Sequence, residues 1–293
     1  MKKIAITTGD IYGIGKEITL KALKELKLPK NQVVIIGEKL NIDYDFIEID
    51  NSSNGEFCFQ SLKKACNLAL ENKIHALVTA PVSKEELHKA GHIFNGQTEV
   101  IESFLSPNEK RAQMVFIADN LKLMLLTRHI PLLDIKLNKN EIINQILILN
   151  DFLKEKYKIN SPKIALLALN PHSGENGVLG CEEIDILNPV SEILNEKGIN
   201  ITKALSADGF FSKIGHEYLT KSKLSYDCIV SCYHDQGLCP FKALAFNKAV
   251  NTTIGLKIIR TSPSSGTAYD IAGKNLANPE SMVEAIKLAI KLS

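Results

Sequence analysis

The chain has 293 residues, of which 45% are hydrophobic, and a formal net charge of +2. That length suggests one large domain or two smaller ones. No basic block interleaves with aromatic residues, so nucleic acid is not expected as a partner. No apolar run approaches the roughly 20 residues of a membrane span, and the apolar start is too short for a signal peptide. We expect a cytoplasmic protein that binds no membrane.

The six cysteines form no CxxC pair, and most lie in apolar runs. This pattern predicts buried free thiols in a reducing compartment. Cys228 and Cys232 are spaced like a metal pair, but Cys228 lies inside a predicted strand, which argues against that interpretation.

The first part of the chain begins with a strand over 4–7, a glycine-rich turn over 8–15 and a helix over 16–26. This order exposes backbone N–H groups at the helix start, which suits an anion, although a plain tight turn explains the glycines equally well. The following stretches are, in order, a strand over 33–37, an irregular polar segment over 41–57, a helix over 56–72 and a strand over 76–80. Ser83 with Glu86 forms a capping box that predicts a helix start. A polar turn over 94–99 precedes a helix over about 99–105.

The middle of the chain predicts a hairpin of strands 113–118 and 121–126, joined by Asp119 and Asn120. The next elements are a helix over 140–156, a strand over 163–169, a helix over 182–196 that Pro189 kinks or splits, a polar interval over 204–211 and a strand over 226–232 that leads into a turn at His234. The chain ends with an extended segment over 247–258, a loop over 260–278 and a helix over 279–292. Strands alternate with helices throughout, which predicts an α/β protein with a parallel or mostly parallel sheet.

Three histidines, His129, His172 and His234, each follow one of these apolar strands. Strand ends of one parallel sheet lie side by side, so the three imidazoles are expected to converge on a divalent metal ion. Asp235 and Asp208 are candidate partners for the second ring nitrogens. The alternative is that these are three unrelated loop histidines.

A metal ion at this position would acidify a bound hydroxyl, from a pKa of about 15.7 toward about 7. That effect suits the oxidation of an alcohol, in which hydride leaves carbon as its oxygen loses a proton. Lys242, Lys84 or a carboxylate is the candidate proton acceptor.

A series of motifs resembles the 4-hydroxythreonine-4-phosphate dehydrogenase family over nearly the whole chain. In chain order they are TGD (8–10), GIGKEI (13–18), TAPVSK (79–84), NGQTE (95–99), HIPL (129–132), NPHSGE (170–175), YHDQG (233–237) and RTSP (260–263). The segment GTAYDIAGK (266–274) with ANP (277–279) resembles the NAD-binding loop of the wider isocitrate and isopropylmalate dehydrogenase superfamily.

The resemblance implies a two-domain α/β/α fold with the active site in the interdomain cleft. One domain would comprise 1–112 and 259–293, and the other 113–258. It also implies a homodimer with active sites at the subunit interface.

Site residues carried over from the resemblance fall into four groups. The metal ligands (zinc, cobalt or magnesium) would be His129, His172 and His234. The catalytic residues would be Lys242, Asp235 and Asp208. The substrate-binding residues would be Gln97, Thr98, Lys242, Asn251 and Arg260. The residues that bind NAD, or NADP, would be Gly266, Thr267, Asp270, Lys274 and Asn278.

The reaction implied by the resemblance is the oxidation of 4-phosphooxy-L-threonine to 2-amino-3-oxo-4-phosphooxybutanoate. This product loses CO2 to give 3-amino-2-oxopropyl phosphate, in pyridoxal 5'-phosphate biosynthesis. Two residues depart from the family pattern, because Gln97 and Ser265 stand where histidine is usual.

Gln97 leaves room for a related metal- and NAD-dependent dehydrogenase that acts on an unphosphorylated diol or hydroxy acid. The same residues are also compatible with a metal-dependent lyase or hydrolase, or with a metabolite-binding protein that catalyses nothing.

Overall fold

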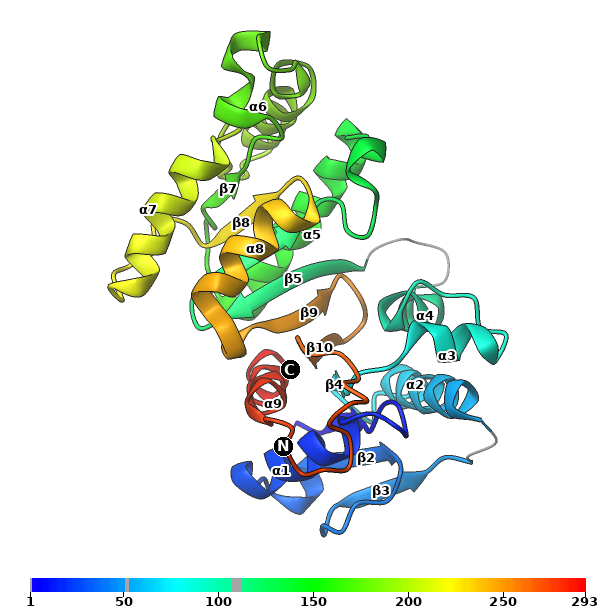
Figure 1. Ribbon diagram of the computed structural model, residues 1–293. Coiled ribbons are helices and arrows are strands. Elements are labelled where there is room, and N and C mark those ends of the chain that lie inside the picture. The colour runs from blue at the N-terminus through cyan, green and yellow to red at the C-terminus, as the bar shows by residue number, and fades with distance from the viewer. Residues whose placement is uncertain (1, 51–52, 107–111) are drawn as a thin grey trace. The chain divides into compact units, whose positions relative to one another are not determined.

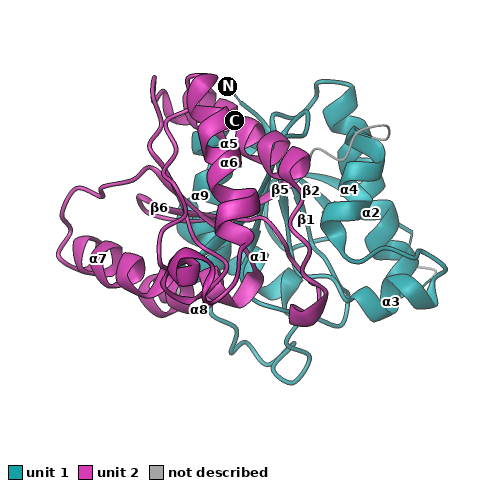
Figure 2. Cartoon of the chain, turned by 90° about the horizontal axis from the view of Figure 1, so that it is seen from above, with its two compact units in different colours: residues 1–112, 247–293 teal, residues 113–246 magenta. Residues whose placement is uncertain are grey.

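The computed structural model describes residues 2–50, 53–106 and 112–293. The chain forms two compact units: unit 1 is Met1–Ala112 with Asn247–Ser293, and unit 2 is Gln113–Phe246 (Figure 2). The second boundary differs from the one expected at 258. Strand β9 (Val250–Ile254) belongs to unit 1, where it pairs with β10 (Ile259–Pro263).

The strands of unit 1 lie in the order β3-β2-β1-β4-β10-β9. The first four in the chain are β1 (Ile4–Thr7), β2 (Val33–Gly37), β3 (Asp45–Glu48) and β4 (Ala76–Thr79). All neighbours pair in parallel except β9, which is antiparallel to β10. Every residue of β1, β2 and β4 is buried, as expected for parallel strands covered on both faces.

Helices cover both faces of this part of the sheet (Figure 1). The two on one face are α1 (Gly15–Leu26) and α9 (Glu280–Leu292), which contact each other. Those on the other face are α2 (Asn54–Leu70), α3 (Lys84–Lys89) and α4 (Gln97–Leu105). Their apolar sides form a buried cluster with the sheet that includes Phe57, Leu62, Leu77, Val100 and Ile101. Ser83 caps α3 as predicted, because its side chain accepts a hydrogen bond from Glu86 N.

The strands of unit 2 lie in the order β5-β6-β8-β7. They are β5 (Gln113–Ala118), β6 (Leu121–Leu125), β7 (Ile164–Leu166) and β8 (Cys228–Ser231). The predicted hairpin is confirmed, because β5 and β6 pair antiparallel, while β8 pairs in parallel with both β6 and β7. The helices of unit 2 are α5 (Lys139–Tyr157), α6 (Asn188–Glu196), α7 (Ala207–Leu219) and α8 (His234–Ala245).

Short helical turns complete the fold. They are the 3-10 turns Lys30–Gln32, Leu132–Asp134, Pro171–Gly177 and Phe246–Lys248 and the π-helical turn Glu183–Leu187. The predicted helix over 182–196 is split, as Pro189 suggested. The π turn ends before α6, and Pro189 stands in the first turn of α6, where its missing N–H costs no hydrogen bond.

Three local predictions were wrong, and a fourth concerns α8. The segment predicted as irregular contains β3, a short strand whose residues are half-buried or exposed. The interval around Asp208 is the start of α7, and the loop predicted from Arg260 begins with the buried strand β10.

The most important correction is α8, which begins at His234 where a turn was expected. Gly237 and Pro240 disfavour a helix, yet α8 packs against the sheet so closely that a Cβ on Gly237 would lie 2.4 Å from Ser231 Oγ.

In the described part of the chain, no helix is long and apolar enough to cross a membrane.

Candidate active site

The three predicted histidines follow three neighbouring parallel strands of unit 2. His129 follows β6, His234 follows β8 in the middle, and His172 follows β7. Beyond the strand ends, Thr127 N and Thr127 Oγ1 both donate to Cys232 O, at 3.2 and 2.7 Å. These bonds hold the two connections together, and the rings of His129 and His234 lie with centroids 5.4 Å apart.

His234 is oriented by the residue that follows it. Its Nδ1 lies 2.6 Å from Asp235 Oδ1, which leaves Nε2 for a ligand. Gln236 stabilises the backbone beside His234, because its Oε1 accepts from Cys232 N at 2.8 Å and its Nε2 donates to Ala168 O at 2.6 Å. Gln236 therefore joins the ends of β8 and β7. No role was predicted for this residue, although it lies within the YHDQG motif.

His172 lies in an unusual backbone segment. Residues 172–176 all have positive φ, and only Gly174 among them is a glycine. Such a left-handed turn costs energy at each non-glycine residue and persists only where its surroundings hold it. Ser173 Oγ donates to Ala204 O at 3.1 Å, and the buried Glu183 accepts from the backbone N–H groups of 169 and 170 at 2.8 Å each.

The partner of the His172 ring is Glu175, whose Oε1 lies 2.9 Å from Nδ1. Glu175 belongs to the NPHSGE motif, but only aspartates were predicted as ring partners. The His172 side chain is 65% exposed, so the left-handed turn presents its ring outward. Asp208, in the first turn of α7, interacts electrostatically with His172.

Asp208 borders a cavity of about 530 Å³ in unit 2. The lining residues are Leu169, Asn170, Pro171, His172, Ser206, Ala207, Asp208, Phe211, Tyr233, Gln236 and Pro240. A hydrogen bond from Ser206 Oγ lowers the pKa of Asp208 below its ordinary value, with further help from Gly209 N–H and His172. The cavity therefore has an ionised carboxylate and an imidazole on its wall. Lys242 is exposed on α8, about 12 Å along the helix axis from His234.

The histidines only partly fit a metal centre within one chain. Two imidazoles at the His129–His234 spacing suit one ion, and Asp235 is a partner for the second nitrogen of one of them. Among residues 2–50, 53–106 and 112–293, however, no three His, Cys, Asp or Glu side chains are grouped so that they could hold a metal ion. Within the described residues of one chain, the three predicted imidazoles are therefore not grouped as one metal centre.

The predicted substrate residues of unit 1 lie near the end of β4. Arg260, in β10, is buried, and its Nε and Nη2 donate to Thr79 Oγ1 at 2.9 and 2.6 Å. Burial lowers the pKa of Arg260 to about 10, and the charge of Glu99 opposes that effect. A buried guanidinium beside a strand end is suited to a phosphate or carboxylate, because an anion offsets the cost of burying its charge.

Two further substrate candidates have unpartnered oxygens. Gln97 Nε2 donates to Ala80 O at 3.1 Å, so Gln97 Oε1 is an acceptor, and this buried atom has no hydrogen-bond partner in the described chain. Asn251 Oδ1 is also a buried oxygen without a hydrogen-bond partner in the described chain. In the pairing of β9 with β10, Thr253 lies directly opposite Arg260. Asn251 is two residues before Thr253 in the same strand, and such residues point to the same face of a sheet. The side chains of Asn251 and Arg260 therefore lie on one face of the sheet. Thr98 is buried in the first turn of α4.

The glycine-rich turn before α1 contacts the predicted cofactor loop. Ile14 N donates to Thr267 O at 2.9 Å, and Tyr269 Oη donates to Asp10 Oδ2 at 2.6 Å. Burial and the Asp10 bond raise the pKa of Tyr269. A Cβ on Gly13 would lie 3.0 Å from Thr267 O, so the turn and loop approach closely.

A cavity of about 450 Å³ lies between this turn, α1 and the loop. Its lining residues are Ile11, Tyr12, Gly13, Lys16, Glu17, Leu20, Ala272, Gly273 and Asn275. An aromatic ring, apolar side chains, a cation and an amide suit part of a dinucleotide, and the Glu17 carboxylate on the wall is engaged with Lys21 Nζ and Ala277 N, so these residues fit the expected cofactor. Gly266, Asp270, Lys274 and Asn278 belong to the same loop. Asn278 Oδ1 accepts from Glu280 N at 2.9 Å, and its Nδ2 is a donor that remains for a ligand.

Comparison with known proteins gives close matches over the full chain. The family model described as pyridoxal phosphate biosynthetic protein PdxA matches residues 6–289. A 4-hydroxythreonine-4-phosphate dehydrogenase of Sulfurihydrogenibium sp. is 41% identical, with 100% of this chain and 98% of that protein covered. A D-threonate 4-phosphate dehydrogenase of Pectobacterium atrosepticum is 36% identical, with 100% and 99% covered.

Solved structures agree with these matches. The crystal structure of 4-hydroxythreonine-4-phosphate dehydrogenase from Klebsiella pneumoniae has a TM-score of 0.85 at 33% identity, covering 100% of this chain and 99% of that one. Isocitrate dehydrogenase from Methylococcus capsulatus has a TM-score of 0.56 at 14% identity, covering 99% and 85%. The second likeness concerns the fold alone, and it confirms the predicted isocitrate dehydrogenase-like α/β class.

Proposed function

The chain belongs to the family of the pyridoxal phosphate biosynthetic protein PdxA, and we propose that its reaction is the oxidation of 4-phosphooxy-L-threonine by NAD. The product, 2-amino-3-oxo-4-phosphooxybutanoate, would then lose CO2 to give 3-amino-2-oxopropyl phosphate for vitamin B6 synthesis. In the first step the C3 hydrogen leaves as hydride to the nicotinamide, and the hydroxyl proton leaves to a base. In the second, the carboxylate carbon leaves as CO2 and a proton replaces it.

The observation that carries this choice of substrate is the unpartnered acceptor on Gln97. Its Nε2 is committed to Ala80 O, so the buried Oε1 requires a donor that the described chain does not supply. The α-ammonium group of 4-phosphooxy-L-threonine is such a donor. Asn251 Oδ1 adds a second acceptor of the same kind. A hydroxyl has one donor and could serve one of these oxygens, whereas an ammonium group has three donors and could serve both, so a substrate with an ammonium group suits this chain better.

The phosphate of the substrate would bind to Arg260 with help from Lys242. Arg260 provides a planar fork of donors and Lys242 a point charge. Thr98 would complete the contact from the first turn of α4. The alternative role of Lys242, as a neutral amine, is to accept the hydroxyl proton, since Asp235 is engaged with His234, and Arg260 would then bind the phosphate without Lys242.

We place the metal site between subunits of a homodimer. His129 and His234 would come from one protomer, and the third imidazole would be His172 of the partner subunit. Two facts support this arrangement: the ring pair within one chain and the outward presentation of His172 on its left-handed turn. When bound, a divalent ion such as zinc, cobalt or magnesium would lower the pKa of the substrate hydroxyl.

The remaining roles follow from the contacts of each residue. Asp235 would orient His234, and Asp208 would act on His172 by charge. NAD, or NADP, would be held by Gly266, Thr267, Asp270, Lys274 and Asn278 with the cavity beside α1. The backbone of Gly266 suits this role, because a Cβ there would meet nothing within 4 Å.

A second candidate substrate is D-threonate 4-phosphate. Relatives named for that activity are 36% and 33% identical to this chain, close to the values for the first group. This substrate carries the same phosphate but a hydroxyl in place of the ammonium group. Arg260 does not distinguish the two, whereas the acceptors on Gln97 and Asn251 favour the amino acid.

The test is to compare NADH formation from 4-phosphooxy-L-threonine, D-threonate 4-phosphate and unphosphorylated 4-hydroxy-L-threonine. We expect kcat/KM to be highest for the first and lowest for the third. A higher kcat/KM for D-threonate 4-phosphate would assign the second function. Preference for the unphosphorylated compound would support a dehydrogenase of diols or hydroxy acids, and no NADH from any of them would favour a lyase, hydrolase or binding protein.

A further inference from the structure

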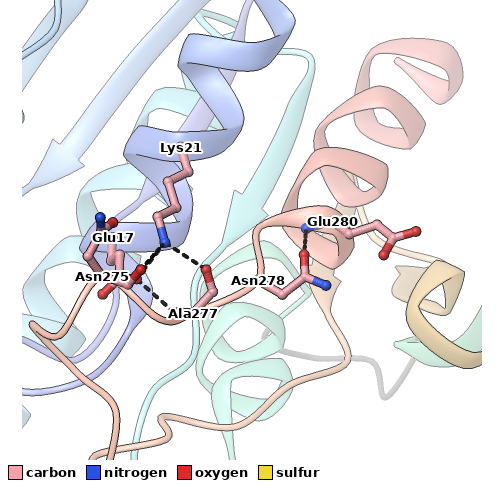
Figure 3. A network of polar contacts seen from close by, with 6 residues as sticks. All are labelled: Glu17, Lys21, Asn275, Ala277, Asn278 and Glu280. Carbon is pink, nitrogen blue, oxygen red and sulfur yellow. Dashed lines mark hydrogen bonds and ion pairs between the residues drawn. The ribbon is translucent and has the colours of Figure 1, made fainter.

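The loop between β10 and α9 is held by two side chains of α1, Glu17 and Lys21, which have no proposed part in the chemical step (Figure 3). Lys21 Nζ donates to Asn275 O at 3.0 Å and to Ala277 O at 2.9 Å. Glu17 Oε1 accepts from Ala277 N at 2.8 Å and from Lys21 Nζ at 2.8 Å. Both side chains therefore bind backbone groups of the loop and each other.

This pair is more than a surface ion pair. The Glu17 and Lys21 side chains are only 14% and 28% exposed, so solvent screens them less than it screens exposed pairs. Burial alone would raise the pKa of Glu17, but the bonds from Lys21 and Ala277 N–H outweigh it and the net pKa is lowered. The carboxylate is therefore charged and fixed at neutral pH.

The anchors lie near the two ends of the predicted dinucleotide segment. Near its start, Thr267 O accepts from Ile14 N, and near its end, Asn275 and Ala277 are bound by Lys21 and Glu17. Within the segment, two backbone hydrogen bonds close tight turns. Ile271 N donates to Ala268 O, and Lys274 N donates to Ile271 O. A loop with so little regular structure of its own depends on contacts at its ends to keep one conformation.

We propose that Glu17 and Lys21 are positioning residues for the cofactor, which hold the loop over 264–278 in the conformation that binds the dinucleotide. This inference rests on the proposed function, because it takes this loop as the NAD loop. Preorganising a binding loop raises affinity by removing the entropic cost of ordering it during binding. The pair would thus act on cofactor affinity and not on the chemical step.

The test uses variants of the full-length protein. Lys21→Met keeps most of the apolar stem and removes the donors, and Glu17→Ala removes the acceptor. Lys89→Met is the matched control, because Lys89 also forms helix ion pairs, with Glu85 and Glu86 on α3. Two quantities are measured: hydrogen exchange of the backbone amide of Ala277 without cofactor, and the Kd for NADH by fluorescence.

We expect Lys21→Met and Glu17→Ala to speed exchange at Ala277 and to raise the Kd for NADH about tenfold, or about 1.4 kcal/mol. The kcat of Lys21→Met at saturating NAD should stay within about twofold, since Lys21 does not line the cofactor cavity and the chemical step is unchanged. Lys21→Arg should restore both measurements, because it keeps donors at the same place. Lys89→Met should behave as the wild type.

Unchanged exchange at Ala277 would overturn the inference, and so would faster exchange with an unchanged Kd for NADH. Failure of the wild type to bind NADH would overturn it together with the cofactor of the proposed function. If the wild type binds NADH and the variants weaken binding, the inference holds even when none of the candidate substrates is oxidised. That last outcome would contradict the proposed function alone.

Discussion

The imidazole rings of His129 and His234 lie 5.4 Å apart and are tilted by 45° to each other. They are brought together by parallel pairing of β6 with β8 and by the bonds from Thr127 to Cys232 O. This spacing suits two ligands of one ion. It also means that the neighbours that orient each ring should control metal affinity.

Asp235→Ala should lower the affinity for Zn²⁺ or Co²⁺ about 10- to 100-fold, because the His234 ring loses the carboxylate bound to its Nδ1. The measurement is competition with a chelator of known affinity. Asp185→Ala removes an exposed carboxylate elsewhere in unit 2 and should leave affinity unchanged. Equal affinities for the two variants would show that Asp235 does not orient a ligand.

Arg260→Lys should lower kcat/KM for the phosphorylated substrate about 100-fold, equivalent to about 2.7 kcal/mol, since a point charge replaces a fork of donors in a buried site. Activity on the unphosphorylated analogue should fall much less. Thr79→Val, which removes the acceptor of the Arg260 bonds, should give a smaller loss of the same kind. Equal losses on both substrates would argue that Arg260 does not bind the phosphate. Circular dichroism of each variant checks folding.

Gln97→His places at this position the residue that is usual in the family. Imidazole gains a charge below a pKa of about 6.5, whereas glutamine has none. A charged imidazole would repel the α-ammonium group that Gln97 Oε1 is proposed to bind, so the KM of the variant for 4-phosphooxy-L-threonine should increase as the pH falls from about 8 to about 6. The wild type, measured alongside, should show a flatter profile. Identical profiles would mean that residue 97 does not face the ammonium group of the substrate.

Gly174→Ala should destabilise the protein by about 1–3 kcal/mol, because the left-handed turn has no room for a side chain. Gly174 has a φ of +77°, and a Cβ would lie 2.7 Å from Glu183 Oε2 and 2.8 Å from Gly180 O. Gly209→Ala is the control, since it lies in α7 with open space around it, and it should stabilise by about 0.5–1 kcal/mol. Urea unfolding measures the stability of both variants. If Gly174→Ala were as stable as the wild type, the tight packing of the turn would be contradicted.

The stability difference between the wild type and Glu17→Gln should depend on pH. The pKa of Glu17 is lowered on folding, so its charge stabilises the folded state at pH values above the unfolded pKa of about 4.3. That contribution is lost as the pH falls through the lower folded value. Urea unfolding at neutral pH should show the wild type more stable by up to about 1 kcal/mol. The difference should vanish in acid, and a pH-independent difference would exclude a charged Glu17.

The order of strands and helices was predictable because buried parallel strands are continuous apolar runs. The sequences of β1, β2, β4 and β8 are of this kind, and all their residues are buried. The placement of the three histidines after neighbouring strands followed from the same pattern. Glycine and proline were less reliable as indicators of turns, because Gly237 and Pro240 suggested a turn where α8 forms.

Tertiary structure decided the features that depend on partners far away in the sequence. Strand β10 is polar in sequence, yet it is buried because it pairs with β4 and β9. The left-handed turn at His172 exists because Glu183 and Ala204 hold it. Lys21 meets Ala277 across 256 residues of chain. Periodicity reports which side of an element is buried, but only the folded chain determines which polar groups become neighbours.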